Sequence, residues 1–194
     1  MPDYTPTTAL IVVDIQNDFA DPNGTLYVPG AGTVIEQANI QIDRALRAGA
    51  PVIYTQDWHP EHTPHFDTHG GPWPVHCVKD TWGAAFHPQL HVEGETIRKG
   101  SNGEDGYSGF TMRNPTTGRD IPTPLHPLLE DRHIDHLVII GLALDVCVKA
   151  TALDALRLGY PTTLIQNATA PVNLHPNDAT QALAELTEAG ATLE

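Results

Sequence analysis

The amino-acid sequence predicts an α/β protein with a Rossmann-like open parallel sheet and helices on both faces, forming a three-layer sandwich. Four apolar runs, at 8–14, 52–57, 137–141 and 162–166, have the unbroken hydrophobicity of strands that are buried on both faces. Helical patterns lie between these runs. The segment "RAGAP" also has a later counterpart in "RLGYP", and each places a glycine and a proline between a helix and the next strand.

Each predicted element has its own residue pattern, from the N-terminus onward. The strand "TALIVVD" at 8–14 is apolar and ends in an acid. In the helix at 34–48 apolar residues recur every three or four positions, and Gly49 ends the helix before Pro51. The later elements are the strand "VIYTQD" at 52–57, a strand "ETIRK" ending at Lys99, the strand at 137–141, a helix at 148–158, the strand at 162–166, a helix at about 177–189 and a short final strand "ATLE".

Length and composition favour one domain, 1–194, with long active-site loops at about 58–95 and 100–127. In such a sheet, ligands bind beyond the carboxyl ends of the strands, where long loops gather. A net charge of −14 argues against a nucleic-acid partner, and no apolar run is long enough to cross a membrane. The N-terminus has no signal-peptide pattern and the chain has only two cysteines, so we expect a cytoplasmic protein.

Three ionisable residues lie at or just after the carboxyl ends of predicted strands: Asp14, Lys99 and Cys147. Singly, each has an ordinary explanation, since Asp14 could cap a turn, Lys99 could be solvated and Cys147 could be a small core residue. Their shared position favours chemistry. Cys147 opens a predicted helix, whose N-terminus lowers the pKa of a thiol, and a nearby lysine would lower it further. With an aspartate to take the thiol proton, the three residues predict an activated nucleophile.

The stretch "TQDWHPEHTPHFDTHGGPWPVHC" at 55–77 holds five of the eleven histidines. Asp57 and His59 are two residues apart at a strand end and therefore project from the same face, and His76 returns after a loop. One carboxylate and two imidazoles are a suitable ligand set for Zn²⁺, Fe²⁺ or Mn²⁺. The pattern leaves open whether His65 is a fourth ligand. The alternative is a solvated loop whose histidines are incidental.

Three other residues of this stretch are predicted to have no part in a metal site. His62 and His69 are expected to be solvated. Cys77 lies beside His76, but we expect a packed side chain and not a thiolate ligand.

Taken together, these residues resemble the nicotinamidase branch of the isochorismatase-like cysteine hydrolases. The matching motifs cover nearly the whole chain and are "VVDIQNDF" (12–19), "TQDWHPEHTPHF" (55–66), "GPWPVHCV" (71–78), "IRKGSNGEDGYSGF" (97–110) and "GLALDVCVKATALDA" (141–155). D-x-H followed by W-P-x-H-C separates the metal-containing members from metal-free relatives. The resemblance implies a Rossmann-like fold and hydrolysis of nicotinamide to nicotinate and ammonia through a cysteine thioester. It thereby implies a role for this reaction in NAD salvage. It also implies activity on pyrazinamide.

The resemblance gives each matching catalytic and metal-binding position a role. The implied catalytic residues are Asp14 as the acid/base, Lys99 and the nucleophile Cys147, and the implied metal ligands are Asp57, His59 and His76, with His65 matching an additional ligand of some relatives. One metal ion would then hold the pyridine nitrogen of the substrate.

The substrate pocket is implied in the same way. Phe19 and Trp73 match aromatic residues that sandwich the pyridine ring, and Tyr107 matches a further wall. The backbone N–H groups of Ala143 and Cys147 match an oxyanion hole, and the Leu142–Ala143 peptide matches a cis bond of the family.

One position departs from the family pattern, because "GLALDVC" has Leu144 where relatives usually carry a small polar residue. The change leaves the triad untouched but puts the substrate preference in question. Two other functions therefore stay open: an amidase of the same superfamily that acts on another small amide or ureido compound, and a metal- or ligand-binding protein without activity. The sequence also leaves the oligomeric state open, a homo-oligomer included.

Overall fold

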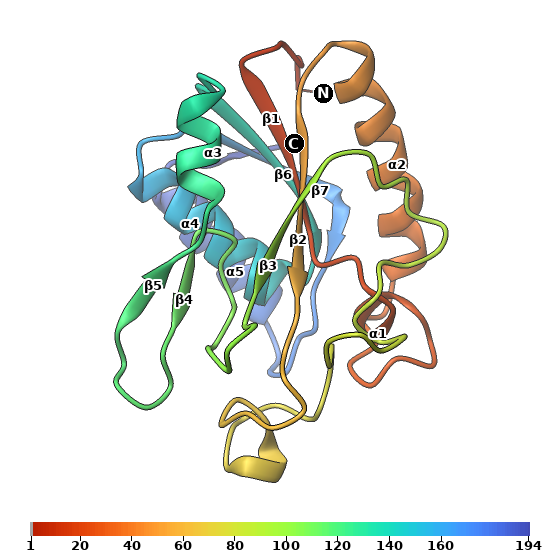
Figure 1. The fold of residues 1–194 in the computed structure, drawn as a ribbon. Coiled ribbons are helices and arrows are strands. Elements are labelled where there is room, and N and C mark those ends of the chain that lie inside the picture. Colours follow the sequence, from red (N-terminus) through yellow and green to blue (C-terminus); the bar gives the residue numbers. More distant parts are fainter. Residues whose placement is uncertain (1) are drawn as a thin grey trace.

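The computed structural model describes residues 2–194 and is built around a six-stranded sheet (Figure 1). All its strands are parallel and lie in the order β3-β2-β1-β6-β7-β8. The strands are β1 (Thr8–Val13), β2 (Val52–Asp57), β3 (Glu95–Lys99), β6 (His136–Leu142), β7 (Thr162–Ala170) and β8 (Thr192–Leu193). The predicted α/β fold is therefore confirmed.

Helices cover both faces of this sheet (Figure 1). The helix α2 (Ala31–Arg47) packs on one face, while α3 (Leu125–Asp131), α4 (Lys149–Arg157) and α5 (Asp178–Glu188) pack on the other. Within β1, Leu10 and Val12 belong to the buried cluster under α2, whereas Ile11 and Val13 belong to the cluster under the other three helices. Successive strand residues point to opposite faces, so a strand covered on both sides must be apolar throughout.

Several short elements were not predicted from the sequence. These are α1 (Asn17–Ala20), a 3₁₀ turn at Asp67–His69, α3, and the antiparallel pair β4 (Thr111–Arg113) and β5 (Asp120–Pro122). The strands β4 and β5 are each three residues long, and their residues are half-buried or exposed. They therefore lack the apolar repeat that marks a buried strand. None of the helices in residues 2–194 is both long and apolar enough to cross a membrane.

The predicted helix at 148–158 is found as α4, but a π-helical turn at Leu144–Val148 precedes it. Cys147 lies in this turn. The π-turn hydrogen bond runs from Val148 N–H to the carbonyl of Ala143 over 3.1 Å. Single π turns of this kind often mark functional sites.

Candidate active site and metal centre

The sheet order places the candidate catalytic residues next to one another. Asp57 ends β2 and Lys99 ends β3, and the two residues are paired across these neighbouring strands. Asp14 follows β1 on the other side of β2, with a left-handed φ of 48° that turns the chain away from the strand. Cys147 follows β6, the next strand beyond β1. Parallel strands end at one edge, so four positions that are far apart in sequence converge there.

Lys99 lies at the centre of a buried cluster of charges. Its Nζ is 2.7 Å from Asp14 Oδ2, 2.5 Å from Asp57 Oδ1 and 3.7 Å from Cys147 Sγ. The ammonium also donates a hydrogen bond to the carbonyl of Gly106. Lys99 and Asp14 are fully buried. A buried ammonium is tolerated only when carboxylates and carbonyls replace its water, as they do here.

The two carboxylates of this cluster differ in their protonation. Burial raises the pKa of Asp14 from its ordinary 3.8 to about 6, against the opposing effects of Lys99 and of the Thr55 hydroxyl, which donates to Asp14 Oδ1 over 2.6 Å. Burial would also raise the pKa of Asp57, but Lys99 and the nearby imidazoles outweigh it and hold this pKa well below its usual range. Asp14 is therefore the carboxylate that can exchange a proton near neutral pH.

Lys99 stays charged in this setting. Burial alone would lower its pKa, but Asp14 and Asp57 outweigh burial and raise the pKa well above its usual value.

The Cys147 thiol differs from the prediction that its pKa is lowered. Burial raises this pKa well above the usual value; Lys99 opposes the rise, and the charges of Asp14 and Asp57 reinforce it. The prediction is wrong because burial of the thiol, reinforced by two nearby carboxylates, outweighs the effect of Lys99, and the sequence does not reveal this burial. The thiol is therefore neutral at rest. Side-chain atoms of Asp14, Asp57 and Cys147 lie within 4.8 Å of one another, which keeps the thiol close to a carboxylate.

Three imidazoles gather beside Asp57. One ring nitrogen from each of His59, His65 and His76 lies within 4.8 Å of the others. Asp57 Oδ2 is 3.8 Å from Nε2 of His59 and 3.8 Å from Nε2 of His76. The structure thus brings together Asp57, His59 and His76, and it adds His65, whose membership the sequence left open.

The hydrogen bonding of these imidazoles fits a bound metal ion. His59 is fully buried, and neither of its ring nitrogens has a hydrogen-bond partner among residues 2–194. A buried polar atom without a partner is costly, so this ring is suited to bind a ligand. Nδ1 of His65 is 2.7 Å from Asp105 Oδ1, and Nδ1 of His76 is 2.7 Å from the Pro74 carbonyl oxygen. Such contacts orient the ring and present Nε2 to a metal.

The charge state of the imidazoles fits a metal ion as well. Burial lowers the pKa of His76 to about 4 and shifts the pKa of His65 in the same direction. Metals bind the neutral ring, so this shift favours binding. Imidazole nitrogens with one carboxylate suit Zn²⁺, Fe²⁺ or Mn²⁺.

The place of His59 depends on the glycine that follows Lys99. A Cβ at Gly100 would lie 2.4 Å from His59 Cε1, and Gly100 has a φ of +76°. Only glycine meets both conditions at little cost.

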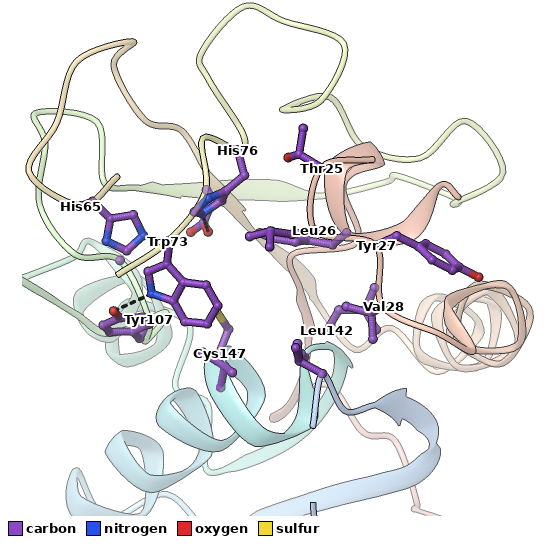
Figure 2. Close-up of a pocket in the computed structure, with 16 residues that line it drawn as sticks. Thr25, Leu26, Tyr27, Val28, His65, Trp73, His76, Tyr107, Leu142 and Cys147 are labelled. Carbon is purple, nitrogen blue, oxygen red and sulfur yellow. Dashed lines mark hydrogen bonds and ion pairs between the residues drawn. The ribbon is translucent and has the colours of Figure 1, made fainter. Parts of the chain in front are cut away.

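A cavity of about 240 Å³ lies over Cys147, His65 and His76 (Figure 2). Figure 2 shows Trp73 and Tyr107 on one side, joined by a 2.9 Å hydrogen bond from Trp73 Nε1 to the Tyr107 hydroxyl. The opposite wall is formed by residues 25–28. Phe19, Ala143 and Val172 also line the cavity. The Leu142–Ala143 peptide beside the cavity is cis, as the family resemblance implies.

The remaining predicted positions lie outside this cavity. Leu144 packs into the buried cluster under α4, so its side chain does not alter the pocket wall, where Val146 stands instead. His62 and His69 are exposed, and their ring centroids lie 5.1 Å apart. Neither belongs to the three-imidazole cluster. Cys77 is fully buried, with its Sγ 3.9 Å from the Gly83 carbonyl oxygen.

Sequence reasoning missed the residues that support the site. Thr55 and Asp105 contact Asp14 and His65 as described above. Gln16 donates from Nε2 to the carbonyls of Asp57 (2.7 Å) and Ala84 (2.8 Å), and its Oε1 accepts from Asp57 N–H over 2.8 Å. A possible signal for Gln16 was its place in "VVDIQNDF", where an amide follows directly on buried apolar residues.

The fold and this site define a class of protein. The family model described as the isochorismatase domain matches residues 8–194, and the chain belongs to this family of hydrolases. Its relatives within the family include nicotinamidases. A nicotinamidase of Escherichia coli is 39% identical over 206 residues, a match that covers 97% of this chain and 94% of that protein.

Solved structures agree with this placement. The pyrazinamidase of Pyrococcus horikoshii in complex with zinc has a TM-score of 0.86 and 37% identity, covering 97% of this chain and 99% of that one. The PnC1 protein of L. infantum in complex with nicotinate has a TM-score of 0.88 and 35% identity, covering 100% of this chain and 95% of that one.

Proposed function

We propose that this protein hydrolyses nicotinamide to nicotinate and ammonia, and that it also accepts pyrazinamide. One observation carries the proposal: Lys99 contacts both Asp14 and Cys147 beside a cavity that is also lined by Asp57, His65 and His76. The cavity thus combines a nucleophile and its base with groups that suit a metal ion. The relatives named nicotinamidase support the same reaction.

Catalysis is assigned to Asp14, Lys99 and Cys147. Asp14, ionised above its pKa of about 6, takes the thiol proton as the sulfur attacks the carboxamide carbon. The protonated acid then gives this proton to the departing ammonia, which leaves a thioester on Cys147. Asp14 next takes a proton from a water that attacks the thioester, and it returns this proton to the Cys147 sulfur as the C–S bond breaks and nicotinate is released. Because the thiol is neutral at rest, its deprotonation and its attack are coupled. Lys99 stabilises the charged forms of both partners throughout.

The substrate is assigned to the groups that line the cavity. Phe19 and Trp73 hold the faces of the ring, and Tyr107 fixes Trp73 through its hydroxyl. The backbone N–H groups of Ala143 and Cys147 receive the oxyanion, a role supported by the position of both residues in the cavity wall.

One divalent metal ion, Zn²⁺, Fe²⁺ or Mn²⁺, is assigned to Asp57, His59 and His76, with His65 as the fourth ligand. The unpartnered ring nitrogens of His59 support this assignment. When bound, the ion would supply an open coordination position for the pyridine nitrogen and withdraw electron density from the ring.

We further propose one domain over 1–194, a cytoplasmic location and a small-molecule substrate, with no nucleic-acid or membrane partner. The net charge of −14 and the two free cysteines support these points.

The experiment that tests the function is ammonia release by purified, zinc-loaded protein from nicotinamide, pyrazinamide, benzamide and a ureido acid. We expect turnover of the first two. Benzamide has the same shape without the pyridine nitrogen and should be a poor substrate. Faster turnover of the ureido acid would make the protein another amidase of the superfamily, and no turnover by zinc-binding protein would make it a binding protein.

A further inference from the structure

We infer that Asp18 is a positioning residue that fixes both the proposed metal site and the facing wall of the cavity. Asp18 lies in α1, one residue before Phe19, and is 6% exposed. Its carboxylate is held by backbone N–H groups: Oδ2 accepts from Cys77 N–H over 2.7 Å, and Oδ1 accepts from Thr25 N–H over 3.2 Å. The inference rests on the proposed function only in its assumption that the imidazole cluster binds a metal ion.

The first of these contacts reaches the metal site. Cys77 directly follows His76, has a left-handed φ of 45°, and accepts a hydrogen bond from His59 N–H at its carbonyl over 3.0 Å. The backbone of Cys77 therefore connects His76, its neighbour in the chain, with His59, which donates to its carbonyl. Asp18 supplies the hydrogen bond that holds this segment in its unusual backbone conformation.

The second contact reaches the opposite wall. Thr25 and Leu26 line the cavity, and Figure 2 shows Leu26 pointing across it toward His76. Asp18 holds Thr25 through its carboxylate, and its backbone carbonyl accepts from Leu26 N–H over 3.0 Å. A single residue therefore sets the spacing between this wall and the metal site.

Gly83 provides the space in which the carboxylate lies. Its carbonyl accepts from Asp18 N–H over 3.0 Å, and a Cβ at Gly83 would lie 2.1 Å from Asp18 Oδ2. Alanine at position 83 would therefore displace the carboxylate without changing its charge. This gives a second, independent way to disturb the same contact.

The test compares zinc release to a chelator from zinc-loaded Asp18→Asn, Gly83→Ala and the double variant. In Asp18→Asn one acceptor oxygen becomes an NH₂ group that cannot accept from a backbone N–H. Groups that support metal ligands contribute about 10–100-fold in affinity, so we expect release at least about tenfold faster in each single variant. Because both act on one contact, the double variant should be no worse than the more affected single variant.

Three further readouts separate positioning from general damage. Asp21→Asn is the matched control, because the Asp21 carboxylate accepts from Asn23 N–H over 2.8 Å and from Asn23 Nδ2 over 2.9 Å, and its ion-pair contact, at 3.9 Å, is with Nε2 of His87, which is not a proposed metal ligand. Its zinc release should equal that of the unmodified protein. In Asp18→Asn the KM for nicotinamide should rise more than kcat falls. Alkylation of Cys147 should keep its rate, since none of its activating partners contacts Asp18.

Zinc retention by Asp18→Asn and Gly83→Ala at the level of Asp21→Asn would overturn the inference. So would zinc release that is faster in the double variant by the product of the two single effects. A failure of the proposed function looks different, since the unmodified protein would then retain zinc and release no ammonia from nicotinamide.

Discussion

The clearest test of the proposed chemistry is Thr55→Val, which removes one hydroxyl and keeps the shape of the side chain. Thr55 is fully buried in β2 and donates to Asp14 Oδ1 over 2.6 Å. This bond favours the ionised form of Asp14 and lowers its pKa. Without it, the pKa of Asp14 rises, and a smaller fraction of the enzyme carries an ionised base at any given pH.

The size of the effect follows from the charge on the acceptor. A hydrogen bond contributes about 1.5–3 kcal/mol to a charged acceptor and about 0.5–1.5 kcal/mol to a neutral one, so this bond favours the ionised form by about 1–1.5 kcal/mol, or about one pKa unit. The pKa of Asp14 should therefore move from about 6 to about 7. At pH 7 the ionised fraction falls from about nine-tenths to about a half, which lowers kcat/KM roughly twofold.

The assay is ammonia release from nicotinamide as a function of pH. In the unmodified enzyme kcat/KM should fall about tenfold for each pH unit well below 6, and in Thr55→Val the same acid limb should lie about one unit higher. Thr163→Val is the control, because Thr163 is also a buried threonine in a strand. Its Oγ1 lies 3.0 Å from His136 Nε2 and not near Asp14. An acid limb that is identical in Thr55→Val and the unmodified enzyme would refute the assignment of Asp14 as the base.

Three further outcomes are expected. Cys147→Ala should abolish turnover while circular dichroism shows an intact fold, because little apolar area is lost. Cys77→Ala should keep substantial activity. Inactivation by alkylation of Cys77 alone would show that Cys77, and not Cys147, is the nucleophile. Lys99→Met should slow alkylation of Cys147 at neutral pH, since it removes the charge that opposes the high pKa of the thiol. It should also lower the melting temperature, because two buried carboxylates lose their partner. Unchanged alkylation kinetics would contradict the contact between Lys99 and the thiol. His59→Ala should lose metal and nicotinamide turnover together in metal analysis and activity assays, while His62→Ala keeps both; full turnover by metal-free protein would defeat the metal's role.

The sequence predicted where the proposed catalytic groups lie because their positions depend on the sheet. Apolar runs mark buried strands, and residues just after such strands must meet at one edge. Asp14, Lys99 and Cys147 could therefore be placed together before any geometry was known. Asp57 and His59 followed from the two-residue repeat of β2.

What the sequence could not predict depends on loops and on shared charges. The position of His65 is set by a segment without regular structure, whose path has no periodic signal. The pKa of Cys147 depends first on the burial of the thiol and then on the distances from Lys99 to Asp14 and Asp57, which only the structure reveals. The short helix α3 contains a proline and too few turns for a helical repeat to stand out.

Gln16 shows how tightly a residue can be constrained without touching substrate. Its side chain continues the pairing of β2 after β1 has turned away, offering a donor and an acceptor to the backbone of Asp57. Glutamate at this position would offer acceptors alone and would face two carbonyl oxygens, and asparagine would be one methylene too short. Amino-acid choice here is set by matching donors to acceptors, whereas shape is the main requirement on the aromatic wall. We therefore expect position 16 to tolerate fewer side chains than position 19.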